Sequence, residues 1–139
     1  MFTLSGVQMS AILVVDDDPG VLKMMANVLS LTGHQARTAA SGVEALKLLG
    51  IRPEDEAVEL PDLILLDIMM PKCDGYTVAK LLRDNPRTRA IPILVVSALA
   101  ELSKLFTATV QVEGFLNKPF APDELLAAVS GVLRRRKPA

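Results

Sequence analysis

The segment 63–67 strongly limits how this chain can fold, because four consecutive apolar residues, Leu63 to Leu66, end at the carboxylate of Asp67. A short run that is apolar at every position is typical of a strand buried on both faces of a parallel sheet. In open α/β sheets, ligands bind at the carboxyl ends of such strands. We therefore expect Asp67 to be a functional residue, with a turn-capping aspartate as the structural alternative.

The size and charge of the chain exclude several classes of protein. Its 139 residues suffice for one domain with a single core. The net charge of -1, from 15 basic and 16 acidic residues, gives no global field for nucleic acid or an anionic membrane. Cys73 is the only cysteine, which excludes an internal disulfide. No apolar run approaches the 18 or so residues of a membrane span, and no secretory signal is evident. We expect a soluble, cytoplasmic protein.

Strand and helix patterns alternate from residue 11 onward. Strands are predicted at 11–15, 35–39, 63–67, 93–96 and 114–117, and helices at 19–31, after Ser41, at 76–84, at 99–110 and from 122 onward. The residues 50–61 are predicted to form an exposed acidic loop. Five strand-helix repeats imply right-handed crossovers and an α/β fold: a doubly wound, five-stranded parallel sheet with helices on both faces.

Two of the predicted helices have informative apolar faces. The helix after Ser41 is expected to carry Val43, Ala45, Leu46 and Leu49 inward. The helix at 99–110 is unusually apolar for an outer helix. Its residues Leu102, Leu105 and Phe106 are candidates for a partner interface.

Polar residues follow the predicted strands where each strand ends, and they are Asp16, Asp17, Asp67, Ser97 and Lys118. One crevice at the carboxyl edge of the sheet can hold all of them. Two carboxylates about 4 Å apart repel by roughly 4 kcal/mol at an effective dielectric near 20, so clustered acids require protonation or a cation. An oxygen-only site suits Mg²⁺, which completes its coordination with phosphate oxygens. Asp67 can then act as the nucleophile towards phosphorus, with Ser97 and Lys118 stabilising the phosphoryl oxygens.

These residues occur in motifs that resemble the receiver domain of two-component response regulators. The motifs are Val14-Val15-Asp16-Asp17, Asp67 followed by Pro71 and Asp74-Gly75, Ser97-Ala98, and Lys118-Pro119-Phe120. The resemblance covers residues 11–133 and implies a flavodoxin-like fold with strand order 2-1-3-4-5. It divides the chain into a flexible tail at 1–10, a receiver domain at 11–135 and a C-terminal tail at 136–139. Whether the protein is a stand-alone, chemotaxis-regulator-like receiver or part of a longer regulator is left open.

The resemblance also implies a role for each residue of the site. Asp67 is the phosphoacceptor, Asp16, Asp17 and Asp67 bind Mg²⁺ together with the backbone carbonyl of Met69, and Ser97 and Lys118 contact the phosphoryl group. Ser97 and Phe115 form a conformational switch, and the Lys118–Pro119 bond is expected to be cis. The chain is then no enzyme but a phosphoacceptor that assists its own phosphorylation and dephosphorylation.

The partners follow from the same resemblance. The donor is a sensor histidine kinase or a histidine phosphotransfer protein, and the effector or output domain is unknown. Phosphorylation changes the surface formed by residues 99–117 and the last helix, and a phosphorylation-dependent homodimer is a candidate outcome. The sequence gives no sign of a membrane partner, and nucleic acid is not expected to bind this domain alone.

Two parts of the sequence are compared with the family pattern: the segment before the last strand and the two residues that influence loss of phosphate. Residues 109–114 replace the small Ala-Gly-Ala turn common before the last strand, which puts the switch surface in doubt. In the family, the residues two positions after the phosphoacceptor and two after the serine orient the water that hydrolyses the acyl phosphate. Here these residues are Met69 and Leu99, which cannot orient water, so we expect slow loss of phosphate.

Three alternative functions fit the sequence less well than a receiver domain does. A phosphatase of the haloacid dehalogenase type fails because Gly20 stands where that motif requires threonine, and no Gly-x-Gly-x-x-Gly follows a strand for dinucleotide binding. A receiver-like interaction module that never takes phosphate should lack an acid, the serine or the lysine, and none is missing.

His34 is interpreted as structural and Cys73 as inert. The basic residues 134–137 complement the negative end of the last helix, with contact to nucleic acid as the alternative.

Overall fold

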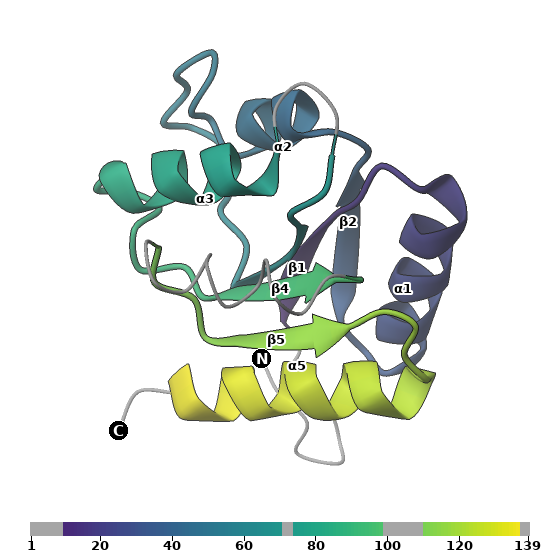
Figure 1. The fold of residues 1–139 in the computed structure, drawn as a ribbon. Coiled ribbons are helices and arrows are strands. Elements are labelled where there is room, and N and C mark those ends of the chain that lie inside the picture. The colour runs from purple at the N-terminus through teal and green to yellow at the C-terminus, as the bar shows by residue number, and fades with distance from the viewer. Residues whose placement is uncertain (1–9, 71–73, 99–109, 137–139) are drawn as a thin grey trace.

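The structure is a computed structural model that describes residues 10–70, 74–98 and 110–136. A parallel sheet of five strands has the order β2-β1-β3-β4-β5, as the resemblance implied. The strands are β1 (Ala11–Val15), β2 (Gln35–Ala39), β3 (Leu63–Asp67), β4 (Ile93–Ser97) and β5 (Gly114–Asn117). The helices are α1 (Pro19–Leu31), α2 (Gly42–Leu48), α3 (Gly75–Asp84) and α5 (Pro122–Arg136). Figure 1 shows β4 and β5 side by side with both arrowheads at the same edge.

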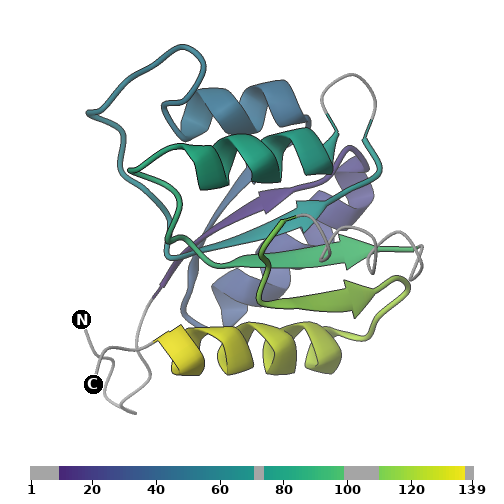
Figure 2. The same cartoon turned by 60° about the vertical axis from the view of Figure 1, so that its left-hand side comes forward.

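The sheet lies between two helical layers. Helices α2 and α3 cover one face, and α1 and α5 cover the other (Figure 2). Alternate residues of β1 point to opposite faces, so that Leu13 packs under α2 and α3 while Ile12 packs under α1 and α5. All five residues of β3 and of β4 are buried, because both strands are covered on both faces. The doubly wound sandwich predicted from the apolar runs is confirmed.

Helix ends are set by local capping. Asp18 precedes α1, and its carboxylate accepts hydrogen bonds from the amides of Gly20 and Val21, while Pro19 occupies the first helical position. Beyond the C-cap of α1, Gly33 has a φ of 94°, a conformation that glycine adopts without strain. Asp18 and Gly33 thus mark where α1 begins and where the chain turns towards β2.

One detail of α2 was predicted wrongly. Val43 was expected to point inward, but it is 60% exposed. The inward stripe consists of Gly42, Ala45, Leu46 and Leu49, whose spacing of three, four and seven matches the helical period. The inward face of α2 therefore begins at Gly42 and not at Val43 as predicted.

The helix predicted at 99–110, with Leu102, Leu105 and Phe106, lies outside the described residues except for its last member. Val110 is in a bend and is buried in the core beneath α3. Among the described helices, none has both the length and the apolarity needed to cross a bilayer.

Residues 110–113, which depart from the family pattern, are tied to α3 by a polar cluster. The Arg83 guanidinium donates hydrogen bonds to the carbonyls of Gln111, Arg89 and Ile91, at 3.0, 2.9 and 2.7 Å. Its Nη2 atom lies 3.6 Å from the Glu113 carboxylate, which also accepts a hydrogen bond from the amide of Ile93. Arg83 and Glu113 thus join the end of α3 to the starts of β4 and β5.

We expect Arg83→Met to lower the free energy of unfolding by about 2–4 kcal/mol, because it removes the cation that faces Glu113 and the donor of three carbonyl groups. Chemical denaturation would measure the loss, provided that the free energy of unfolding depends on denaturant concentration with the same slope in the native protein and the variant. The control is Lys80→Met on the same helix, which removes an exposed cation 3.9 Å from Asp84 and should change stability by less than about 0.5 kcal/mol. Equal stabilities for the two variants would show that the cluster does not hold the fold.

Candidate functional site

The predicted site residues come together because parallel strands end at one edge. Asp16 follows the last residue of β1, Asp67 and Ser97 are the last residues of β3 and β4, and Lys118 follows β5. The strand register places Asp67 beside Val96 and Ser97 beside Asn117. Residues separated by up to 102 positions are thereby brought to one place.

Three carboxylates form the centre of this site. Asp16, Asp17 and Asp67 each offer an oxygen, and these oxygens lie within 4.8 Å of one another. Asp16 and Asp67 are buried, with exposures of 0% and 4%, whereas Asp17 is exposed. Two buried acids next to a third require compensating positive charge.

Backbone amides hold the two buried carboxylates in place. The amide of Asp18 donates a hydrogen bond to Asp16 Oδ1 at 2.9 Å. The amide of Met69 donates one to Asp67 Oδ1 at 3.0 Å. The sequence predicted both acids but not these hydrogen bonds, which depend on how the chain turns after each strand.

The ammonium group of Lys118 supplies positive charge. Its Nζ atom lies 2.6 Å from Asp16 Oδ2 and 3.5 Å from Asp67 Oδ2. The backbone amide of Lys118 donates a hydrogen bond to the Ser97 carbonyl, which fixes the end of β5 against β4. The Lys118–Pro119 peptide bond is cis, as the resemblance implied.

Burial and charge shift the proton affinities of two of these groups. Burial raises the pKa of Asp67 above its ordinary value, Asp16 and Asp17 raise it further, and the hydrogen bond from Met69 and the charge of Lys118 partly oppose the shift. Burial alone would lower the pKa of Lys118, but the carboxylates of Asp16 and Asp67 raise it overall. Lys118 therefore remains charged at neutral pH.

The donor set of the acidic cluster fits a hard divalent cation. All three side chains offer oxygen, and Asp17 keeps the cluster open to solvent. Mg²⁺ prefers one or two carboxylates together with waters and phosphate oxygens. The residues present therefore suit Mg²⁺ better than a metal that prefers nitrogen or sulfur ligands.

The remaining predicted residues lie around this cluster. Ser97 is 1% exposed at the end of the neighbouring strand, and Met69 is 51% exposed two positions after Asp67. Phe115 pairs with Val95 in the sheet and is 39% exposed, so it lies before the carboxyl edge rather than in the cluster. Leu99 and Cys73 lie outside the described residues.

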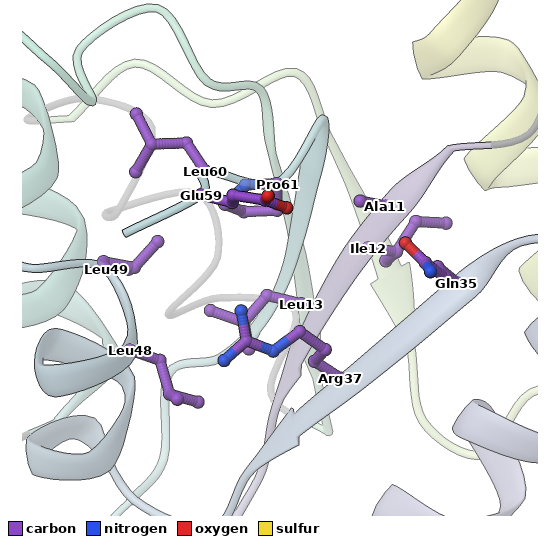
Figure 3. A pocket seen from close by; sticks show the side chains of 10 residues that line it. All are labelled: Ala11, Ile12, Leu13, Gln35, Arg37, Leu48, Leu49, Glu59, Leu60 and Pro61. Atoms are coloured by element: carbon purple, nitrogen blue, oxygen red, sulfur yellow. The ribbon is translucent and has the colours of Figure 1, made fainter. Parts of the chain in front are cut away.

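His34 and a small cavity lie at the opposite edge of the sheet. His34 precedes β2, its Nδ1 atom is buried without a hydrogen-bond partner, and burial lowers its pKa. The cavity has a volume of about 60 Å³ and includes the first residues of β1 and β2, Ala11 and Gln35, with Arg37 and Glu59 among its polar lining residues (Figure 3). Ligand pockets usually have volumes of about 300 Å³ or more, so this cavity is too small to be a candidate ligand site.

Sequence comparison identifies relatives over nearly the whole chain. A family model described as the response regulator receiver domain matches residues 12–130. The chain is 38% identical over 129 residues to the DNA-binding dual master transcriptional regulator RpaA of Synechocystis sp., covering 91% of this chain and 50% of that protein. It is 39% identical over 128 residues to the response regulator MprA of Mycobacterium avium, covering 91% and 52%. The chain thus spans about half the length of these relatives.

Solved structures with the same fold include two response regulators. The chemotaxis protein CheY4 of Vibrio cholerae has a TM-score of 0.76 at 29% identity, covering 90% of this chain and 99% of that one. The phosphorylated cyanobacterial phytochrome response regulator RcpA has a TM-score of 0.74 at 28% identity, covering 90% and 91%. With the family match over residues 12–130, the chain belongs to the receiver domain family of two-component response regulators.

Proposed function

We propose that this receiver domain accepts a phosphoryl group on Asp67 from a phosphohistidine and passes the signal on through a change of its surface. The observation that carries this proposal is the grouping of Asp67 with Asp16, Asp17 and Lys118 at the carboxyl edge of the sheet. Within the described residues, this grouping combines a buried nucleophile with a cation site and a fixed ammonium group. Enzymes and domains that transfer phosphoryl groups rely on such a positioned nucleophile and on positive charge for the phosphoryl oxygens.

In the proposed step, a carboxylate oxygen of Asp67 forms a bond to phosphorus while the bond from phosphorus to the imidazole nitrogen breaks. The imidazole keeps the electron pair and takes up a proton, so that an acyl phosphate and a neutral histidine result. The Met69 amide orients the carboxylate through its hydrogen bond to Oδ1. The Lys118 ammonium, 3.5 Å from Asp67 Oδ2, would balance charge on the phosphoryl oxygens, and Ser97, the last residue of β4, would donate a hydrogen bond to one of them.

Asp16, Asp17, Asp67 and the carbonyl of Met69 would hold Mg²⁺, which would supply positive charge to the phosphoryl oxygens. Lys118 pairs with Asp16 at 2.6 Å. A cation held by these acids would lower the negative charge around Asp67 and so favour the approach of an anionic donor.

The proposed partners follow from this chemistry. The donor is a sensor histidine kinase or a histidine phosphotransfer protein. RpaA is named as a DNA-binding transcriptional regulator, and this chain covers 50% of it, so an output module of that kind is a candidate effector. The domain is not an enzyme acting on a separate substrate, because the group modified is its own Asp67.

Phosphorylation is proposed to move Ser97 towards the phosphoryl group and to alter the packing of Phe115, which is 39% exposed on β5. A homodimer through the surface next to β5 is one outcome of such a change. A phosphorylation-independent interaction module is the alternative function. No observation favours it, since each acid and the lysine of the site is in place.

Asp67→Asn is expected to abolish labelling by acetyl phosphate in the presence of Mg²⁺, because the nucleophilic oxygen is lost. Burial raises the pKa of Asp67 in the folded protein above the ordinary value that it has in the unfolded chain. The free energy of unfolding therefore falls as the pH rises from the ordinary pKa to the raised one. The neutral asparagine should therefore leave the thermal midpoint at pH 7 unchanged or higher. Asp62→Asn, at the other edge of the sheet, is the control and should be labelled normally. Labelling of Asp67→Asn at the native level would exclude Asp67 as the acceptor.

Asp17→Asn is expected to weaken Mg²⁺ binding by about ten-fold or more, because it removes one charge from the cation site. Asp17 is exposed, so the fold should be little affected. Calorimetric titration would measure the affinity, and Asp84→Asn, an exposed acid at the end of α3, should bind Mg²⁺ as the native protein does. An unchanged affinity in Asp17→Asn would remove Asp17 from the metal site.

The acyl phosphate is expected to be long-lived, because the apolar side chain of Met69 cannot orient an attacking water. Met69→Asn should speed the loss of phosphate, and the double change Met69→Asn with Leu99→Glu should speed it most. Leu31→Asn, 87% exposed at the end of α1, gives a polar change away from the site and should leave the rate unchanged. Decay of the native phosphoprotein as fast as that of the double variant would show that another group positions the water.

A further inference from the structure

The first residue of α3 lies directly against the main chain of the phosphoacceptor. A Cβ atom built on Gly75 would lie 2.4 Å from the Asp67 carbonyl oxygen and 2.5 Å from the Ile68 Cα atom. Both neighbours are backbone atoms, which cannot turn aside as the end of a flexible side chain can. A side chain at position 75 would therefore force α3 and the segment 67–68 apart by roughly half an ångström or more.

The requirement for glycine at position 75 is steric. Gly33 and Gly50 adopt positive φ angles of 94° and 68°, where glycine is favoured for its conformational freedom. Gly75 instead begins a regular helix and has no such φ. Glycine is required at position 75 because the start of α3 lies against the end of β3.

Helix α3 is anchored too firmly to yield to such a side chain. The Asp74 carboxylate caps the first turn by accepting a hydrogen bond from the Thr77 amide at 2.8 Å. Val78, Ala79 and Leu82 are fully buried against the sheet. The displacement would fall mainly on the segment 68–69, which follows Asp67, the last residue of β3.

The segment 67–69 carries two of the proposed Mg²⁺ ligands. The Asp67 carboxylate is oriented by the Met69 amide at 3.0 Å, and the carbonyl of Met69 is the expected backbone ligand. Ile68 lies between them, so a shift of its Cα atom moves both ligands relative to Asp16, which the Asp18 amide holds in the turn after β1.

We propose that Gly75 is a positioning residue for the phosphorylation site: the absence of a side chain lets the first turn of α3 set the place of Asp67 and of the Met69 carbonyl. This inference rests on the proposed function and adds to it a link between the site and α3. The helix that starts at Gly75 and the ligands at 67–69 then form one rigid unit.

The test compares Gly75→Ala with Gly50→Ala. In Gly50→Ala the new Cβ would also meet backbone, the carbonyl oxygen of Asp55, but in the loop after α2. Three quantities are measured in each protein: thermal unfolding by circular dichroism, Mg²⁺ affinity by calorimetry and the rate of labelling by acetyl phosphate. Both variants are expected to lose stability. Only Gly75→Ala should be labelled about ten-fold or more slowly and bind Mg²⁺ several-fold more weakly.

Native labelling and Mg²⁺ affinity in a folded Gly75→Ala protein would overturn the inference, as would equal losses in both variants. If Gly75→Ala does not fold, Asp74→Ala loosens the same turn without adding an atom, and Ser41→Ala removes the corresponding cap of α2. Slower labelling and weaker Mg²⁺ binding in Asp74→Ala alone would support the inference, and equal effects would contradict it. If the native protein takes no label, the proposed function fails, while the Mg²⁺ measurement still decides the role of Gly75.

Discussion

The constraint on which the site depends is the repulsion between carboxylates gathered at one edge of the sheet. Asp16 and Asp67 are buried beside Asp17, and the chain compensates with the Lys118 ammonium group and two backbone amides. These compensating groups come from β5 and from the turns after β1 and β3. A cation or another charged group bound at this edge of the sheet would therefore change the balance of charge at one point.

Much of this arrangement was predictable because it is encoded locally. Apolar runs such as 63–66 identify strands buried on both faces, and parallel strands necessarily place Asp67 and Ser97 at the same edge. The caps at Asp18 and Ser41 were recognisable from residue type and spacing. Strand order and the grouping of the acids with Lys118 followed from the family resemblance and from the topology.

Other features could not be predicted because they depend on contacts between distant segments. The partners of Arg83 lie 6 to 30 residues away, and nothing in the local sequence distinguishes Arg83 from a solvated helical arginine. The dipeptide Asp74-Gly75 is typical of a turn, and nothing in the sequence indicates that Gly75 packs on the Asp67 carbonyl as it does in the structure. The exposure of Val43 was missed because a seven-residue helix leaves its inward face ambiguous by one position.

The central claim is that Asp67 receives the phosphoryl group while Mg²⁺ and Lys118 balance its charge. An experimental structure of the protein crystallised with Mg²⁺ and beryllofluoride, a phosphoryl mimic, tests this most directly. We expect beryllium bonded to Asp67, the metal held by Asp16, Asp17 and the Met69 carbonyl, and the Lys118 ammonium moved from Asp16 to a fluoride. Beryllofluoride bound elsewhere, or Lys118 still paired with Asp16 beside a modified Asp67, would contradict this claim.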